Sequence, residues 1–190
     1  MKIGLDIMGG DFAPQATLKG AIEAKKALNS EVDIVLIGNE SIARELLIKL
    51  NFDPEKFIYI NASQVVEMSE HATRALKKKP DNSISVGFKA LKLGEIDVLA
   101  SAGNSGAMLV GSMFSVGPVP GVIRPCITSV LPKENGGVGV ILDVGVNADC
   151  KPDVLYQFAI LGSLFAELVY HIKYPKVGLL NIGEEKEKGN

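Results

Sequence analysis

The stretch GLDIMGGDFAP, residues 4–14, joins a short apolar strand to the start of a helix through two adjacent glycines and an aspartate. Folding alone does not require two residues without side chains at the end of a strand. Glycine has no side chain, so another group can approach its backbone closely. In parallel α/β sheets, ligands bind at the carboxyl ends of the strands, where loops of this kind lie. The stretch therefore predicts the first strand–loop–helix unit of an α/β fold, with a binding site beside it.

The rest of the chain repeats this alternation of short apolar runs and helix-period segments. Runs that are rich in β-branched residues and bounded by Gly, Asn or Pro predict strands, and an apolar stripe at helical spacing predicts helices. The predicted strands are 2–8, 32–38, 57–61, 96–100, 127–131, 138–144 and 177–182, and the predicted helices are 14–29, 41–50, 83–93, 105–115 and 152–172. We expect an α/β fold with a mostly parallel sheet and helices on both faces, in a single domain over residues 1–190.

The chain stops on the charged stretch NIGEEKEKGN, directly after the last predicted strand. In a βα pattern a helix should follow such a strand. We therefore expect residues 1–190 to be the N-terminal portion of a longer chain, with the C-terminal part missing.

The composition excludes several classes of protein. Hydrophobic residues make up 47% and charged residues 22% of the chain, which is the balance of an ordinary globular protein. A formal net charge of −2 provides no overall basic field for nucleic acid. Asp6 interrupts the apolar run that a signal peptide would need. We expect a cytoplasmic protein in which Cys126 and Cys150 are free thiols.

The segment 153–172 is apolar nearly all round and about long enough to cross a bilayer. Asp153, Gln157 and Glu167 interrupt it, and Pro152 stands where a helix of a globular protein begins. These polar positions favour a buried core or dimer helix over a membrane span. Contact with a lipid surface stays open, so peripheral association with the inner face of the membrane remains an alternative.

Three further loops follow predicted strands and carry unusual residues. In SAGNSGA, residues 101–107, small side chains precede a helix start, which is the layout of an anion cradle made by backbone N–H groups. Asn104, Ser105 and Gly106 are the candidate phosphate-binding residues. The alternative is that Asn104 or Ser105 only caps the helix.

The loop DVGVNADCKPD, residues 143–153, offers polar side chains that are either helix caps or substrate contacts. The candidates are Asp143, Asn147, Asp149 and Lys151. Cys150 is a weaker candidate for a nucleophile, because neither His71 nor His171 stands in an evident position to activate it.

Two basic segments are further candidates. Lys186 and Lys188 stand between Gly183 and Gly189, and they could hold a phosphate or stabilise developing negative charge; a solvated charge run is the alternative. The loop 74–82 concentrates positive charge on an acidic protein and could dock an acidic partner. Its candidate docking residues are Lys77, Lys78 and Lys79, with Arg124 as a weaker addition.

Several signatures of other chemistry do not occur in the sequence. The chain has no GxxxxGK[ST] motif for a nucleoside triphosphate and no Cys/His cluster with zinc spacing. The glycine run GGVGV, residues 136–140, precedes its predicted strand, so it is not a dinucleotide-binding fingerprint. We expect neither a metal nor a cofactor.

Taken together, the motifs resemble one known family, the phosphate acyltransferases of bacterial phospholipid synthesis, also called acyl-ACP:phosphate transacylases. The resemblance runs from residue 1 to 190 and rests on DIMGGDFAP, SAGNSGA, GVIRP, DVGVNADCKPD and VGLLNIGEEKEKGN. It implies a fold similar to phosphotransacetylase and to the isocitrate and isopropylmalate dehydrogenases. It also implies transfer of a fatty acyl group from acyl carrier protein to inorganic phosphate, in a homodimer without a redox cofactor. A membrane acyltransferase would then use the acyl phosphate.

The chemistry of acyl transfer suggests roles for the candidates. Phosphate must be held near the thioester carbonyl, and fixed donors must stabilise the oxyanion that the attack creates. We assign phosphate to the residues of SAGNSGA with Lys186 or Lys188 as the cation, and the oxyanion to Asn147 with one of these lysines. The remaining candidates, at the first strand end, would admit the substrate or fix the loop: Asp6, Gly9, Gly10 and Asp11.

Two rival interpretations remain open. One is an oxidoreductase on the dehydrogenase-like version of this fold, which would bind a nucleotide and usually a metal. The other is a catalytically incomplete fragment or a dimeric scaffold, in which the apolar helix at 153–172 builds the dimer and the loops bind partners.

Overall fold

The structure is a computed structural model that describes residues 1–147 and 149–180. The chain divides into two compact units, Met1–Gly117 and Pro118–Asn190. We describe each unit by itself. The expectation of a single domain stays a prediction.

The first unit contains a parallel sheet, as the strand–helix alternation predicts. The strands run in the order β3-β2-β1-β4, and each pairs in parallel with its neighbour. In the register of β1, Gly4 lies opposite Val35 on one side and Leu99 on the other. The strands are β1 (Lys2–Asp6), β2 (Asp33–Gly38), β3 (Ile58–Asn61) and β4 (Val98–Ala100).

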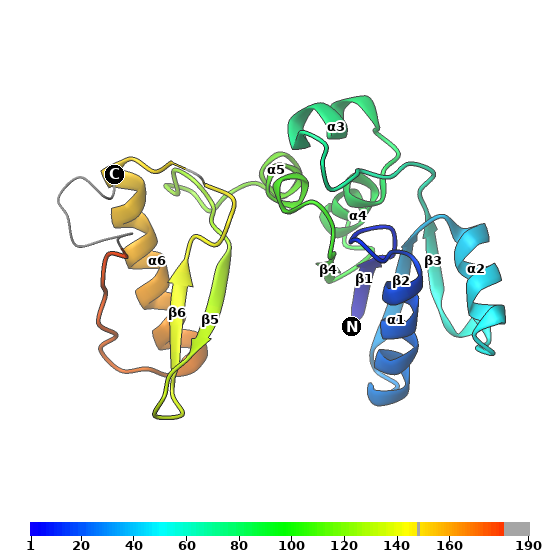
Figure 1. Ribbon diagram of the computed structural model, residues 1–190, viewed down its shortest axis with the longest axis horizontal. Helices are drawn as coiled ribbons and strands as arrows, with labels where there is room; N and C mark the ends of the chain where they lie inside the picture. The colour runs from blue at the N-terminus through cyan, green and yellow to red at the C-terminus, as the bar shows by residue number, and fades with distance from the viewer. Residues whose placement is uncertain (148, 181–190) are drawn as a thin grey trace. The chain divides into compact units, whose positions relative to one another are not determined.

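Helices cover both faces of this sheet, which confirms the predicted layering for the first unit (Figure 1). Successive side chains of a strand point to opposite faces. Ile34 and Leu36 of β2 therefore join the core with α1 and α2, whereas Val35 and Ile37 pack with α4. The helices are α1 (Gln15–Ala27), α2 (Glu40–Lys49), α3 (Ala72–Lys78), α4 (Ser83–Lys92) and α5 (Ser105–Ser115), with a 3₁₀ turn η1 (Pro54–Lys56).

The basic segment at 74–82 is not the loop that we expected. Most of it belongs to α3, which buries Ala75 and carries Lys77 and Lys78 in its last turn. The helix ends shortly before Pro80, because proline restricts the preceding residue to extended conformations. The sequence predicts a loop here because the many charged residues outnumber the short apolar face around Ala75.

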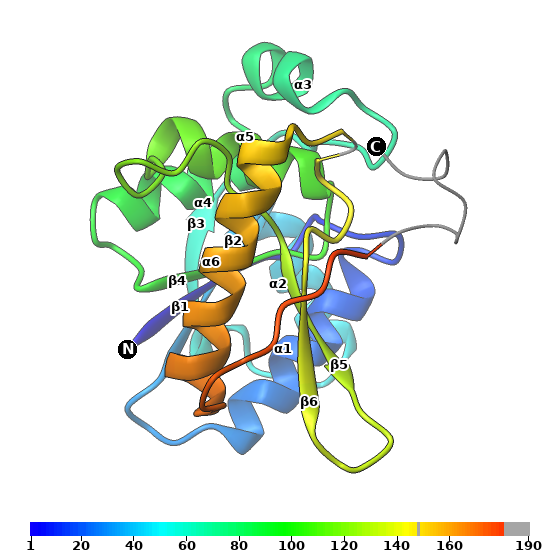
Figure 2. The ribbon, with the colours of Figure 1, turned by 90° about the vertical axis from the view of Figure 1, so that its left-hand side faces the viewer.

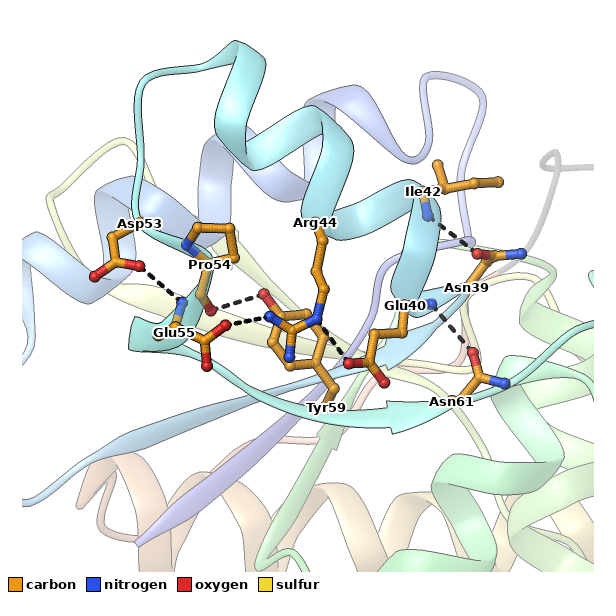
Figure 3. A network of polar contacts seen from close by, with 9 residues as sticks. All are labelled: Asn39, Glu40, Ile42, Arg44, Asp53, Pro54, Glu55, Tyr59 and Asn61. Carbon is orange, nitrogen blue, oxygen red and sulfur yellow. Dashed lines mark hydrogen bonds and ion pairs between the residues drawn. The ribbon is translucent and has the colours of Figure 1, made fainter.

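A polar network ties α2 and η1 to the edge strand β3 (Figure 3). The Arg44 guanidinium lies 4.2 Å from the centre of the Tyr59 ring. Its Nε donates to Glu40 at 2.7 Å and one of its NH2 groups donates to Glu55 at 2.5 Å. The Tyr59 hydroxyl donates to the Pro54 carbonyl. The network therefore holds three consecutive elements together at the surface.

The second unit corrects the expectation that its strands join a parallel sheet. β5 (Thr128–Pro132) and β6 (Val138–Leu142) pair with each other in antiparallel orientation. Only a few residues join them, and the Lys133 N–H donates to the Gly137 carbonyl across this turn at 2.8 Å. A parallel pair needs a crossover of about a dozen residues or more, which this connection is too short to provide.

The strand expected at 177–182 does not form in its described part, because residues 177–180 lie outside helix and strand. Within the described residues of this unit, the sheet has two strands, β5 and β6, and residues 177–180 pair with neither of them. The last two residues of that prediction lie outside the described residues.

The apolar helix α6 (Pro152–Tyr170) lies beside the β5–β6 hairpin (Figure 2). In the described part of the chain it is the one helix long and apolar enough to cross a membrane, by length and composition alone. Only Val154, Phe158 and Ala166 are buried, so the expected core helix is not buried within this chain. A hairpin of two strands offers too little surface to cover all sides of α6. Its dimer and lipid contacts stay predictions.

Candidate active site

Two glycine loops touch at the carboxyl ends of the neighbouring strands β1 and β4. A Cβ atom added to Gly103 would lie 2.5 Å from Gly9 Cα, and one added to Gly9 would lie 2.7 Å from Gly103 N. Real Cβ atoms do not approach other atoms this closely. The protein's own packing therefore accounts for the bare backbone at Gly9. Close approach of a substrate stays a prediction for Gly10, where φ is +100° and the loop turns.

A buried carboxylate holds these loops together. Asp6 is completely buried, and one of its oxygens accepts a hydrogen bond from Ser101 Oγ at 2.7 Å. The other oxygen accepts the Met8 N–H at 2.9 Å. Ser101 Oγ accepts the Gly103 N–H in turn. Asp6 thus fixes both loops, whereas Asp11 is exposed on the surface of the first loop.

Ser101 was not among the predicted site residues, although a signal for it was present. Leu5 pairs with Ala100 in the sheet, so the next residues of the two strands, Asp6 and Ser101, come to lie side by side. A polar residue at the carboxyl end of each of two adjacent parallel strands indicates such a pair. The sequence alone left the strand order open, so this signal was not readable without the pairing.

Asn104 caps α5, as one of the two interpretations of SAGNSGA predicts. Its side-chain oxygen accepts the Ala107 N–H at 2.9 Å, and its amide group donates to the carbonyls of Glu67 and Glu70. The side chain is buried, and its polar atoms are engaged with the protein. A phosphate role for Asn104 stays a prediction.

The backbone at the start of α5 remains available to an anion. Within the described residues, the N–H groups of Ser105 and Gly106 have no hydrogen-bond partner in the protein. The N–H groups of a first helical turn point away from the helix and carry partial positive charge. Ser105 is exposed and Gly106 is half-buried. The structure therefore shows a cap and free N–H groups together, so the two interpretations of this loop are compatible.

In the second unit, Asp143 organises the loop between β6 and α6. Its carboxylate accepts N–H groups from Ile127 at 2.6 Å, Val146 at 2.9 Å and Asn147 at 2.7 Å. Burial opposes the charged form, but the N–H groups of Asn147, Ile127 and Val146 outweigh it and hold the pKa of Asp143 below its usual value. The charged carboxylate therefore joins the loop to the start of β5.

The remaining candidates of this loop lie around that carboxylate. The Asn147 amide donates to the Pro125 carbonyl at 3.0 Å, and Arg124 donates to the Asp149 carbonyl at 3.1 Å. These bonds lay the segments around Arg124 and Asn147 side by side. Lys151 is exposed and stands at the N-cap of α6.

In the described part of the second unit, the surroundings of the two cysteines do not favour a reactive thiolate. Burial raises the pKa of the Cys126 thiol, and the negative charge of Asp143 adds to the effect. Cys150 precedes α6, whereas His171 follows it, so the helix separates them by roughly 28 Å at 1.5 Å per residue. His171 therefore cannot activate Cys150.

The predicted basic residues differ in their exposure and in their contacts. Lys77 and Lys78 are exposed on α3, but Lys79 donates to Glu70 at 2.6 Å and to the Val65 carbonyl at 2.7 Å. Lys79 is thus engaged inside the unit. The candidate cations Lys186 and Lys188 lie outside the described residues. Among residues 1–147 and 149–180, no group of three or more His, Cys, Asp or Glu side chains is placed to hold a metal ion.

Comparisons with known proteins agree with the resemblance drawn from the motifs. The model of a family described as fatty acid synthesis protein matches residues 1–190. Phosphate acyltransferases from Dictyoglomus thermophilum and Clostridium novyi are 43% and 41% identical to this chain over its whole length. The chain covers 56% and 57% of these two proteins, so it spans little more than half the length of the relatives.

Solved structures support the fold. A phosphotransacetylase from Streptococcus pyogenes aligns with a TM-score of 0.67 at 19% identity. The alignment covers 98% of this chain and 60% of the phosphotransacetylase chain. The phosphotransacetylase EutD from Staphylococcus aureus aligns with a TM-score of 0.57 at 18% identity. The alignment covers 87% of this chain and 52% of the EutD chain. At such identities the likeness shows the fold alone. The family match over residues 1–190 and the 41–43% identity to proteins of that name show that this chain belongs to the phosphate acyltransferase family of fatty acid synthesis proteins.

Proposed function

We propose that the protein to which these residues belong transfers a fatty acyl group from acyl carrier protein to inorganic phosphate. The product is an acyl phosphate for phospholipid synthesis. The observation that carries this proposal is the contact of two glycine loops beside the start of α5, where the Ser105 and Gly106 N–H groups have no protein partner among the described residues. Family membership supports the proposal, since the relatives are named phosphate acyltransferases.

In the proposed reaction, a phosphate oxygen attacks the thioester carbonyl carbon and forms the new C–O bond. The carbonyl oxygen carries the negative charge of the tetrahedral intermediate. When the intermediate collapses, the C–S bond breaks and the carrier protein leaves as a thiolate. A thiol with a pKa of about 8.5 is a good leaving group, so the reaction needs no strong general acid. Positioning of phosphate and stabilisation of the oxyanion then supply most of the catalysis.

The proposed roles follow this chemistry. The first unit would hold phosphate through the N–H groups of Ser105 and Gly106, with Asn104 setting the geometry of their loop. Lys186 or Lys188 would supply the cation. In the second unit, Asn147 is the candidate for the oxyanion, and the substrate-contact candidates beside it are Asp143, Asp149 and Lys151.

The first test is phosphate-dependent release of free thiol from acyl-acyl carrier protein, measured with intact mass on the same sample. Thiol release that needs phosphate and yields acyl phosphate supports the proposal. Active protein that keeps its rate in the Lys186→Ala/Lys188→Ala double variant would contradict the cation assignment. Titration with inorganic phosphate provides a second readout on the chain as it stands, because binding can survive where turnover needs the rest of the protein.

We also propose that exposed basic residues dock the acidic carrier protein. Lys77 and Lys78 on α3 are exposed, and Arg124 is a weaker candidate in the second unit. Lys79 is left out because Glu70 and Val65 engage its ammonium group. Charge reversal at Lys77 and Lys78 should weaken binding of the carrier protein and reduce its salt dependence. Unchanged affinity in low salt would contradict this docking surface.

The wider setting of the enzyme is part of the same proposal. A homodimer in the cytoplasm, attached peripherally to the membrane or free, would pass its acyl phosphate to a membrane acyltransferase. Sedimentation and vesicle binding of the full-length protein test these two points separately.

A further inference from the structure

The segment 65–72 is a turn that lies against the start of α5. A Cβ atom added to Gly106 would lie 3.3 Å from the Ala72 Cβ. The Asn104 amide donates to the carbonyls of Glu67 at 2.9 Å and Glu70 at 3.0 Å, and its backbone N–H donates to the Met68 sulfur at 3.0 Å. One buried side chain thus joins the turn to the loop that precedes α5.

A charged pair closes this turn from the other side. One oxygen of the Glu70 carboxylate accepts both the Lys79 ammonium at 2.6 Å and the Glu67 N–H at 2.8 Å. The same ammonium donates to the Val65 carbonyl at 2.7 Å. The Lys79 and Glu67 hydrogen bonds hold the pKa of Glu70 below its usual value. The two side chains therefore connect the beginning and the end of the turn to the end of α3.

Asn104 needs such external support. Its φ is +28°, a backbone conformation that few residues other than glycine adopt. Conformations of this kind persist only when surrounding contacts determine them. The carbonyls of Glu67 and Glu70 are among those contacts, and the pair Glu70–Lys79 sets where these carbonyls lie.

We propose that Glu70 and Lys79 are positioning residues that act through Asn104 to hold the SAGNSGA loop in the conformation that receives phosphate. The inference rests on the proposed function, since it concerns the same loop. It assigns Lys79 a role different from the docking role that its charge predicted. It also explains why a lysine at the end of α3 points into its own unit and not toward solvent.

The test is calorimetric titration of inorganic phosphate into the wild-type chain and into the variants Glu70→Gln and Lys79→Met, with the melting temperature measured alongside. We expect about tenfold weaker phosphate binding in both variants, a typical size for coupling between two groups that share one structural element. The melting temperature should change little, because the Lys79 and Glu70 side chains are still 29% and 33% exposed and solvent weakens such a pair. Glu23→Gln is the matched control, since it removes a surface pair of similar length, with Lys26 on α1.

Lys79→Arg decides whether the ion pair is the positioning element. This variant keeps the charge and should bind phosphate more tightly than Lys79→Met does. If Lys79→Arg binds phosphate as weakly as Lys79→Met does, the proposal is wrong. This outcome also counts if Lys79→Met is poorly folded, because Lys79→Arg keeps the charge that the proposal requires. If wild type binds phosphate and Glu70→Gln binds it equally well, the positioning role alone is overturned. If wild type does not bind phosphate, both this role and the assignment of phosphate to the loop fall.

Discussion

The helices α4 and α6 show how differently the two units bury apolar sequence. In α4, ten residues long, Ser83, Ile84, Gly87, Phe88 and Ala90 are buried. In α6, nineteen residues long and apolar enough to cross a membrane, only three residues are buried. The difference lies in the partner surfaces: α4 packs on the strands β1, β2 and β4 and on α5, whereas α6 packs on the hairpin strand β6. Apolar composition alone therefore does not bury a helix.

The second unit leaves apolar surface uncovered for the same reason, a partner surface that is too small. A cavity of about 640 Å³ lies between β6, α6 and the segment 172–180, and most of its lining is apolar. The first unit has a sheet with two covered faces, against which α1, α2 and α4 pack. The described part of the second unit has one small sheet for one long helix. Its apolar surface therefore exceeds what its own elements can cover.

The largest expected effect tests this difference directly with two helical leucines. Leu18 on α1 is 0% exposed and Leu168 on α6 is 71% exposed. We expect Leu18→Ala to lower the free energy of unfolding by about 2–5 kcal/mol, because it leaves a cavity in a closed core. Leu168→Ala should change it by less than about 0.5 kcal/mol. Urea unfolding of both variants measures the values, and equal losses would show that α6 is covered in solution.

The second prediction concerns the contact between the glycine loops. Gly103→Ala should destabilise the chain by about 1–3 kcal/mol, because its Cβ would overlap the Gly9 backbone, which cannot move aside as a side chain can. Gly20→Ala is the control, since a Cβ there meets nothing within 4 Å on helix α1. We expect Gly20→Ala to stabilise by about 0.5–1 kcal/mol. Similar melting temperatures for the two variants would contradict the tight loop contact.

The third prediction uses the loop of the second unit. Asp143→Asn should cost about 1 kcal/mol at neutral pH, because an amide replaces a partly exposed carboxylate that accepts N–H groups. The folded pKa of Asp143 is lowered, so its contribution is present above the unfolded value of about 3.9 and is lost as the pH falls through the folded value. Urea unfolding at neutral and acidic pH should therefore show the gap between wild type and variant shrinking in acid. Glu134→Gln, in the exposed hairpin turn, is the control. If it lowers the free energy of unfolding by as much as Asp143→Asn does, with the same pH dependence, the prediction for Asp143 is wrong.

The smallest expected effect is at the surface of the first unit. Arg44→Met removes the contacts to Glu40, Glu55 and the Tyr59 ring (Figure 3). The melting temperature should fall by no more than a few degrees, because these groups are partly exposed, the Arg44 side chain by 34% and that of Glu55 by 76%. The difference from wild type should shrink further in about 1 M salt, which screens exposed charges. A loss as large as that of Leu18→Ala would mean that the network, and not the core, dominates the stability of this unit.

Local patterns were sufficient for most elements of the first unit, although the short helix α3 lies where a loop is expected. The helices predicted at 83–93 and 105–115 are observed as Ser83–Lys92 and Ser105–Ser115. Their signals lie within a few residues of one another, in the caps and in the apolar spacing. The same reasoning failed for the antiparallel hairpin, because strand periodicity does not tell which strand pairs with which.

The amino-acid sequence by itself determined the family, the alternation of strands and helices, and the loops that carry the candidate residues. Each of these depends on residues that are close together in the sequence. Only the tertiary structure decided what the side chains in those loops touch. Asp6 meets Ser101 across 95 positions of the chain, and Asn104 meets Glu67 across 37. Such partners are set by the order of the strands and by the packing of distant loops, and no local pattern encodes them.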